Sequence, residues 1–166
     1  MNTSLYLFGE ITTESVKPII EKIIGLNNEP YTQDDSISLY INSDGGSVTD
    51  AFALTDVILN SNITVNTVCT GLVCSAATII YLAGCKRYAY EHSTFIFHNT
   101  SSDIDGMNKD DLMEYNSWLN RLEEWVLELY DNTTGNKCLH DIFNSHRECR
   151  ITTDEAFKLG IVSDII

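Results

Sequence analysis

The chain has 166 residues and a formal net charge of −14 at pH 7. This length suits one compact domain, and the acidic balance excludes nucleic acid as an expected partner, because binding phosphates requires a basic surface. No apolar run of about 18 residues occurs, so we expect no membrane span, and the N-terminus lacks the basic and apolar stretches of a secretory signal. Five cysteines, an odd number without CxxC spacing, predict reduced thiols in a cytoplasmic protein and no metal or other cofactor.

The predicted elements alternate between strands and helices. Strands are predicted at 5–8, 37–41, 64–69 and 94–97, and helices at 12–24, 48–59 and 76–83. Gly25 is expected to end the first helix and Gly71 the third strand, and the residues at 42–46 are expected to form a turn. This alternation predicts an α/β fold with right-handed crossovers.

A long amphipathic helix is predicted from Lys109 to Tyr130. Its apolar side consists of Leu112, Leu119, Leu122, Trp125, Val126 and Leu129. Nothing in the remaining sequence obviously covers this apolar stripe. The helix therefore either projects and packs on a neighbouring subunit or folds back on its own domain.

Three features could carry chemistry. Ser75 is predicted between a strand and the N-terminus of a buried helix, where backbone N–H groups converge and can stabilise an oxyanion. The pair Gly45-Gly46 lets a backbone approach a ligand, and His98 ends an apolar strand. Taken singly, the serine is more often a helix cap, the glycines a tight turn and the histidine structural. Ser75 and His98 matter as a pair, because a hydroxyl needs a base to become a nucleophile.

The order of these features resembles the proteolytic subunit of Clp protease, ClpP. The sequence INSDGG at 41–46, then Gly71 with Ser75-Ala-Ala, then Phe97-His98-Asn99 follows the family's INSPGG, GxAASMG and MIHQP. The segment SLYLFGEI at 4–11 is similar to the family's first core strand, and DEAFKLGIV at 154–162 to its closing PEAxxyGLVD. The resemblance covers residues 4–166.

The resemblance implies a ClpP/crotonase-like α/β fold with repeated β-β-α units. It implies one peptidase domain at 1–166, with a head at about 1–100 and 135–166 and a projecting handle helix at about 107–132. It also implies a serine endopeptidase that cleaves peptides and unfolded proteins. Ser75 would be the nucleophile and His98 the base, Gly46 and Ala76 would supply the oxyanion N–H groups, and Glu148 would orient the histidine.

The implied assembly is a homo-oligomer of heptameric rings, stacked as a tetradecamer. The handle helix and Arg147 would lie at the contact between rings. An AAA+ Clp unfoldase is an implied partner, although the chain begins at the first core strand and we expect it to lack the axial loops that contact such an unfoldase.

Several positions depart from the family pattern: Glu148 replaces Asp, Asp44 replaces Pro, and Cys74 and Thr78 replace small residues. His146, Asp103 and Asp105 are rival partners for the histidine. Three other functions therefore stay open. They are a catalytically degenerate scaffold or regulatory ring subunit, a crotonase-type acyl-CoA enzyme, and a phage prohead maturation protease of the same fold.

Overall fold

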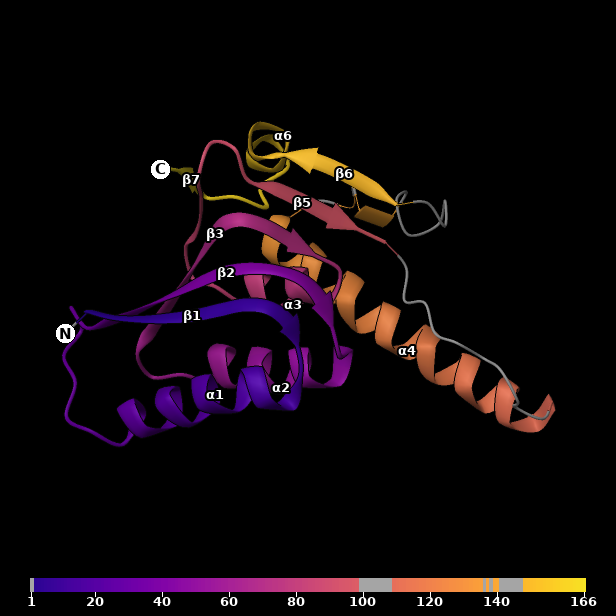
Figure 1. Cartoon of the computed structure of the whole chain (residues 1–166), viewed down its shortest axis with the longest axis horizontal. Coiled ribbons are helices and arrows are strands. Elements are labelled where there is room, and N and C mark those ends of the chain that lie inside the picture. The colour runs from indigo at the N-terminus through magenta and orange to yellow at the C-terminus, as the bar shows by residue number, and fades with distance from the viewer. Residues whose placement is uncertain (1, 99–108, 136, 138, 141–147) are drawn as a thin grey trace.

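The computed structural model describes residues 2–98, 109–135, 137, 139–140 and 148–166, with only the backbone described at 109–112. Within these ranges the chain forms one twisted sheet with helices packed on it (Figure 1). The strands are β1 (Asn2–Ile11), β2 (Ser36–Gly46), β3 (Thr64–Cys74), β4 (Arg87–Ala89), β5 (Thr94–Phe97), β6 (Cys149–Thr152) and β7 (Asp164–Ile165). The helices are α1 (Thr13–Asn27), α2 (Val48–Leu59), α3 (Ala76–Leu82), α4 (Lys109–Thr134) and α6 (Thr153–Lys158).

The sheet branches at β3. The strands β1, β2 and β3 are parallel neighbours. The first half of β3 then pairs with β4, from Thr67 opposite Arg87 to Cys69 opposite Ala89, and its second half pairs with β5, from Leu72 opposite Thr94 to Cys74 opposite Ile96. The strand β6 runs antiparallel to β5. The predicted α/β fold is confirmed, and the branch places the ends of β3 and β5 side by side.

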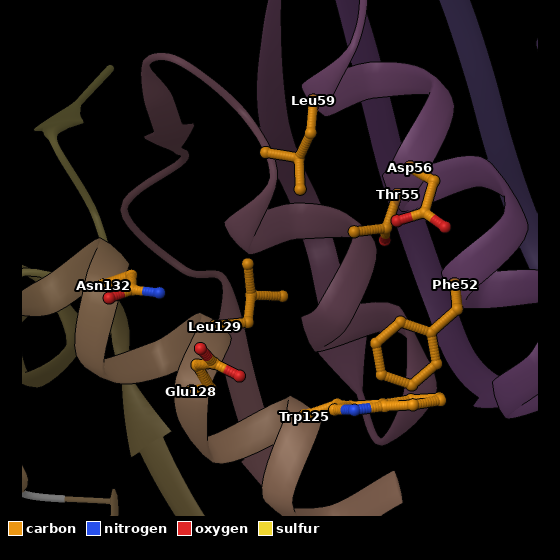
Figure 2. A pocket seen from close by; sticks show the side chains of 8 residues that line it. All are labelled: Phe52, Thr55, Asp56, Leu59, Trp125, Glu128, Leu129 and Asn132. Atoms are coloured by element: carbon orange, nitrogen blue, oxygen red, sulfur yellow. The ribbon is translucent and has the colours of Figure 1, made fainter.

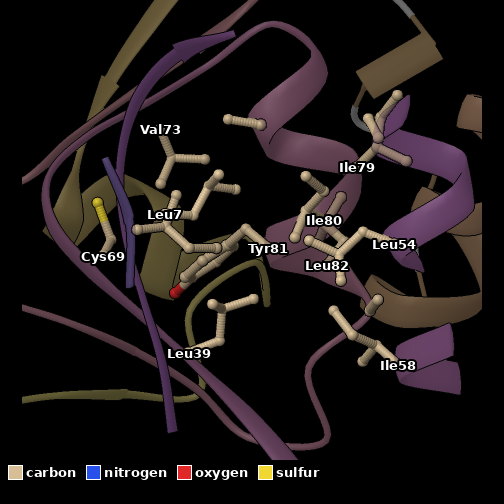
Figure 3. Packing of buried hydrophobic residues seen from close by; sticks show 14 of the residues in the cluster. Leu7, Leu39, Leu54, Ile58, Cys69, Val73, Ile79, Ile80, Tyr81 and Leu82 are labelled. Carbon is tan, nitrogen blue, oxygen red and sulfur yellow. The ribbon is translucent and has the colours of Figure 1, made fainter. Parts of the chain in front are cut away.

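Apolar side chains fill the space between the sheet and helices α2 and α3. Leu7, Leu39 and Val73 point from three parallel strands toward Leu54 of α2 and toward α3 (Figure 3). Every residue of α3 is buried, as its almost entirely apolar sequence predicted. A helix packed on all sides has little freedom to move, so the residue at its N-terminus is held firmly by the core.

Five predicted element ends were too early, those of β1, α1, β2, β3 and α4, and three of them have a clear structural cause. The helix α1 continues through Gly25 because Leu26, in the next turn, is buried. The strand β2 includes the predicted turn, since Glu10 and Ile11 of β1 still pair with the two glycines at 45–46. The strand β3 passes Gly71 because it changes partners there, from β4 to β5.

The long helix α4 extends away from the sheet, and its C-terminal part packs on the rest of the chain (Figure 1). The expectation that nothing covers its apolar stripe was only partly right. Leu122 and Val126 are buried in their own chain, at 5% and 7% exposure, whereas Trp125 stays 43% exposed. Part of the stripe therefore folds back on its own domain, and part of it stays exposed. None of the helices within the described ranges combines the length and the apolar character needed to cross a membrane.

Candidate active site

Ser75 occupies a strained turn between β3 and α3. Its backbone has φ 55° and ψ −128°, and among the described residues it alone has a positive φ without being glycine. Such a conformation costs about 1–3 kcal/mol and is concentrated at functional sites. Ser75 is the N-cap of α3, yet its hydroxyl makes no capping hydrogen bond. Ser75 therefore does not cap the helix through its side chain, which is the usual structural role of a serine at a helix start.

Gly45 packs directly on this turn, and Gly46 packs on β1. A Cβ atom on Gly45 would lie 2.8 Å from the Ser75 Cβ and 2.9 Å from the Cys74 carbonyl oxygen. A Cβ atom on Gly46 would lie 2.4 Å from the carbonyl oxygen of Ile11 in β1. Both glycines have positive φ, at 101° and 141°. Gly45 thus forms a side-chain-free glycine wall beside Ser75, and Gly46 allows β2 to lie close against β1.

His98 follows β5, at the same edge of the sheet as Ser75. The Ser75 N–H donates a hydrogen bond of 3.0 Å to the carbonyl oxygen of Ile96. Because β3 and β5 are parallel, Ser75 and His98 both lie just beyond the carboxyl ends of neighbouring strands. His98 is half-buried. The structure therefore brings the two residues singled out from sequence into one region.

Glu148 reaches the same region from β6. Phe97 lies opposite Cys149 in the antiparallel register of β5 and β6, so the next pair in that register is His98 and Glu148. The Glu148 carboxylate, however, accepts a hydrogen bond of 2.6 Å from Nε of Arg150. Residues two apart on a strand share a face, and this partner could have been found from the sequence by that rule.

Cys74 precedes Ser75 and would be a rival nucleophile if its thiol were ionised. Burial raises the pKa of the Cys74 thiol, and the nearby carboxylates of Glu148 and Asp44 raise it further. The reactive form of cysteine is the thiolate. The environment of Cys74 therefore disfavours its thiolate, the form that a cysteine nucleophile needs.

The structure says less about the remaining predicted site residues. Ala76 is the first residue of α3, so its N–H lacks an acceptor within the helix and is available to a ligand. Arg147 and the rival partners Asp103, Asp105 and His146 lie outside the described residues. In the described part of the chain, no group of three or more histidine, cysteine or acidic side chains is placed to hold a metal ion.

An open groove lies away from Ser75, between α2 and α4. It has a volume of about 360 Å³. Phe52, Leu59, Trp125 and Leu129 provide its apolar surface, with carboxylates of Asp56 and Glu128 at its side (Figure 2). The Trp125 ring meets the Phe52 ring edge-on, with centroids 5.8 Å apart. The groove is thus an exposed apolar surface on the face of α4 that the chain itself does not cover.

Known proteins show the same organisation. The family model for Clp protease matches residues 1–166. The ATP-dependent Clp protease proteolytic subunit of Borreliella afzelii is 27% identical over 98% of this chain and 82% of its own length, and proteolytic subunit 3 of Frankia casuarinae is 28% identical over 98% and 76%. A solved structure of a mutant ClpP1 from Listeria monocytogenes has a TM-score of 0.84 and 26% identity, covering 98% of this chain and 90% of that one. The chain belongs to the Clp protease family, and it is a peptidase subunit of the ClpP type.

Proposed function

We propose that the chain is a serine endopeptidase in which Ser75 is the nucleophile and His98 the general base. The observation that carries the proposal is the Ser75 turn, where a non-glycine residue holds φ 55° and its hydroxyl does not cap the helix. A strained serine at a strand-to-helix turn presents its Oγ atom clear of the backbone, as hydrolases that use nucleophilic serine require.

The reaction proceeds in two transfers. Ser75 Oγ attacks the peptide carbonyl while His98 takes the hydroxyl proton, and the N–H groups of Gly46 and Ala76 stabilise the oxyanion that forms. His98 then gives its proton to the leaving amine, and the C–N bond breaks. Water, activated by the same histidine, hydrolyses the acyl-enzyme and restores Ser75.

Glu148 is proposed as the carboxylate that orients His98. Its position in the β5–β6 register supports this role. Arg150 competes for the carboxylate through its hydrogen bond of 2.6 Å. Since the Glu148 and Arg150 side chains are 47% and 68% exposed, their ion pair is weak, and Glu148 can turn from Arg150 to the histidine at little cost.

The working form is proposed to be a heptameric ring, with two rings stacked. The exposed part of α4 supports an assembly, because Trp118 and Trp125 are 44% and 43% exposed. Their rings meet edge-on. A closed ring buries such surfaces on every copy. Arg147 is proposed for the contact between rings, and an AAA+ Clp unfoldase is proposed as a partner in the cytoplasm that supplies unfolded polypeptides.

The test is peptide hydrolysis by the assembled protein and by its Ser75→Ala variant, with native mass spectrometry of both. Removing a nucleophile of this kind lowers kcat by about 10⁴-fold or more. We expect equal assembly masses and loss of hydrolysis in the variant. Hydrolysis that survives in Ser75→Ala would exclude the assignment, and an 18.6 kDa species alone would exclude the ring.

A further inference from the structure

Tyr130 of α4 is a buried tyrosine whose hydroxyl lies deep inside the protein. The residue is 1% exposed, and its hydroxyl oxygen lies 2.6 Å from Oγ1 of Thr78 in α3. Burial raises the pKa of Tyr130 above its usual range, so the phenol stays neutral and keeps its proton. A buried hydroxyl is costly unless its hydrogen bonds are made, which indicates that this contact holds α4 on α3.

The direction of the hydrogen bonds is fixed by the next contact. Thr78 Oγ1 lies 2.6 Å from the carbonyl oxygen of Ser75, which can only accept. The single hydroxyl proton of Thr78 is therefore given to Ser75, and Tyr130 must be the donor to Thr78. The result is a chain from the Tyr130 hydroxyl through the Thr78 hydroxyl to the Ser75 carbonyl oxygen. The Thr78 N–H donates to the same carbonyl oxygen at 2.9 Å.

These hydrogen bonds fix the orientation of the peptide group that joins Ser75 to Ala76. The Ser75 carbonyl and the Ala76 N–H belong to one planar peptide group, and no peptide bond in the described residues is cis. In a trans peptide the N–H points opposite to the C=O. Holding the Ser75 carbonyl toward Thr78 therefore aims the Ala76 N–H in the opposite direction, away from Thr78.

The same tyrosine also touches the strand that carries His98. Its ring meets the Phe97 ring edge-on, with centroids 5.5 Å apart and planes at 75°. Phe97 is 1% exposed and directly precedes His98. One side chain of α4 thus contacts both Thr78, which hydrogen-bonds to Ser75, and the strand that precedes His98.

We propose that Tyr130 and Thr78 are positioning residues that aim the Ala76 N–H at the oxyanion and fix the turn of Ser75. This inference rests on the proposed function, because it assigns a catalytic use to that N–H. The pair acts through Ser75 and Ala76 and touches no substrate. Its loss should affect the transition state, where the oxyanion is charged, more than the bound substrate.

The experiment compares Tyr130→Phe, Thr78→Val and the double variant in peptide hydrolysis. Losing an oxyanion donor outright lowers kcat by about 10²–10³-fold, so a misaimed donor should lower it by about 10-fold while KM changes by less than about 3-fold. The double variant should be no slower than the slower single variant, because both changes break one chain. Thr78→Ser keeps the hydroxyl and should retain the rate.

Tyr81→Phe is the matched control. Tyr81 is 0% exposed, its ring contacts Phe95, and its hydroxyl donates to the carbonyl oxygen of Tyr88 at 3.1 Å. The Tyr81→Phe variant loses a buried hydroxyl of the same kind, away from Ser75. Its kcat should stay within about 2-fold of the wild-type value. A peptide boronate, which forms a tetrahedral adduct with the serine, should bind the Tyr130→Phe variant about 10-fold more weakly than wild type, in step with kcat.

The outcomes separate this inference from the function on which it rests. A wild-type protein that serine-directed probes do not acylate at Ser75 would overturn both. Acylation in wild type with unchanged kcat and boronate affinity in Tyr130→Phe and Thr78→Val would overturn the positioning role alone. If thermal denaturation shows that Tyr130→Phe does not fold, the Thr78→Val and Thr78→Ser pair decides. If Tyr81→Phe and Tyr130→Phe lowered kcat equally, the Tyr130 hydroxyl would contribute only to stability, and the proposal would be contradicted.

Discussion

A methyl group on Gly45 should disable the active site without unfolding the protein. In Gly45→Ala the new Cβ atom would lie 2.8 Å from the Ser75 Cβ, 2.9 Å from the Cys74 carbonyl oxygen and 3.3 Å from the Ala76 nitrogen. The first two distances are shorter than real Cβ contacts permit, and the atoms it meets belong to or adjoin the backbone of the Ser75 turn. The turn must therefore move away from the glycine wall.

Two costs combine in this variant. An L-residue at φ 101° carries backbone strain of about 1–2 kcal/mol, and overpacking at the turn adds about 1–3 kcal/mol. A total of about 2–5 kcal/mol reduces stability but leaves a domain of this size able to fold in its assembly. A displacement of Ser75 by about 1 Å lowers the rate about 10²-fold, and we expect at least that loss.

The assay is the rate of Ser75 acylation by a fluorophosphonate, measured beside thermal denaturation. Gly9→Ala is the matched control, since Gly9 also has a positive φ, at 83°, but its Cβ atom would have no neighbour within 4 Å. We expect Gly9→Ala to lose comparable backbone stability and to keep the acylation rate. Equal acylation rates in Gly45→Ala and Gly9→Ala would show that the glycine wall does not support the nucleophile.

Further predictions concern charge, thiol reactivity and assembly. Glu148→Gln should lower kcat by about 10²- to 10⁴-fold with rings intact, and full activity would leave a Ser75–His98 dyad. Arg150→Gln frees the Glu148 carboxylate, so kcat should stay or rise, and a loss as large as that of Glu148→Gln would make the ion pair itself essential. Because the pKa of Cys74 is raised, its alkylation should be slow near pH 8 and accelerate as the pH rises past its usual pKa; rapid modification at neutral pH would contradict this. Trp125→Asp should shift native mass spectra toward smaller species, and unchanged assembly would remove the α4 groove from the interface.

Much of the fold could be predicted because its signals are local. The apolar runs at 37–41 and 94–97 and the buried helix at 76–83 are typical of parallel α/β proteins. The ends of β2 and β3 could not be predicted, because they depend on pairing between distant segments. Gly71 stays inside β3, for example, where the Leu72 N–H donates to the Asn42 side chain at 2.9 Å, a partner 30 residues away in sequence.

The candidate site also has features that the sequence predicts and features that depend on contacts between distant residues. Ser75 and His98 could be proposed from the order of motifs, since each motif is a contiguous segment. The role of Gly45 against Ser75 and the pairing of Thr78 with Tyr130 could not be found. Those contacts join residues 30 and 52 positions apart. The first depends on how the end of β2 lies beside β3, and the second on how α4 lies across α3. The covered half of the α4 stripe was missed for the same reason.

The most direct test of the central claim is the site of covalent labelling on the native protein. The assembled wild-type chain is treated with a fluorophosphonate, digested, and analysed by peptide mass spectrometry, with Ser75→Ala in parallel. We expect one modified serine, Ser75, in wild type and no modification in the variant. Labelling at another residue, or none in a folded and assembled wild-type protein, would contradict it.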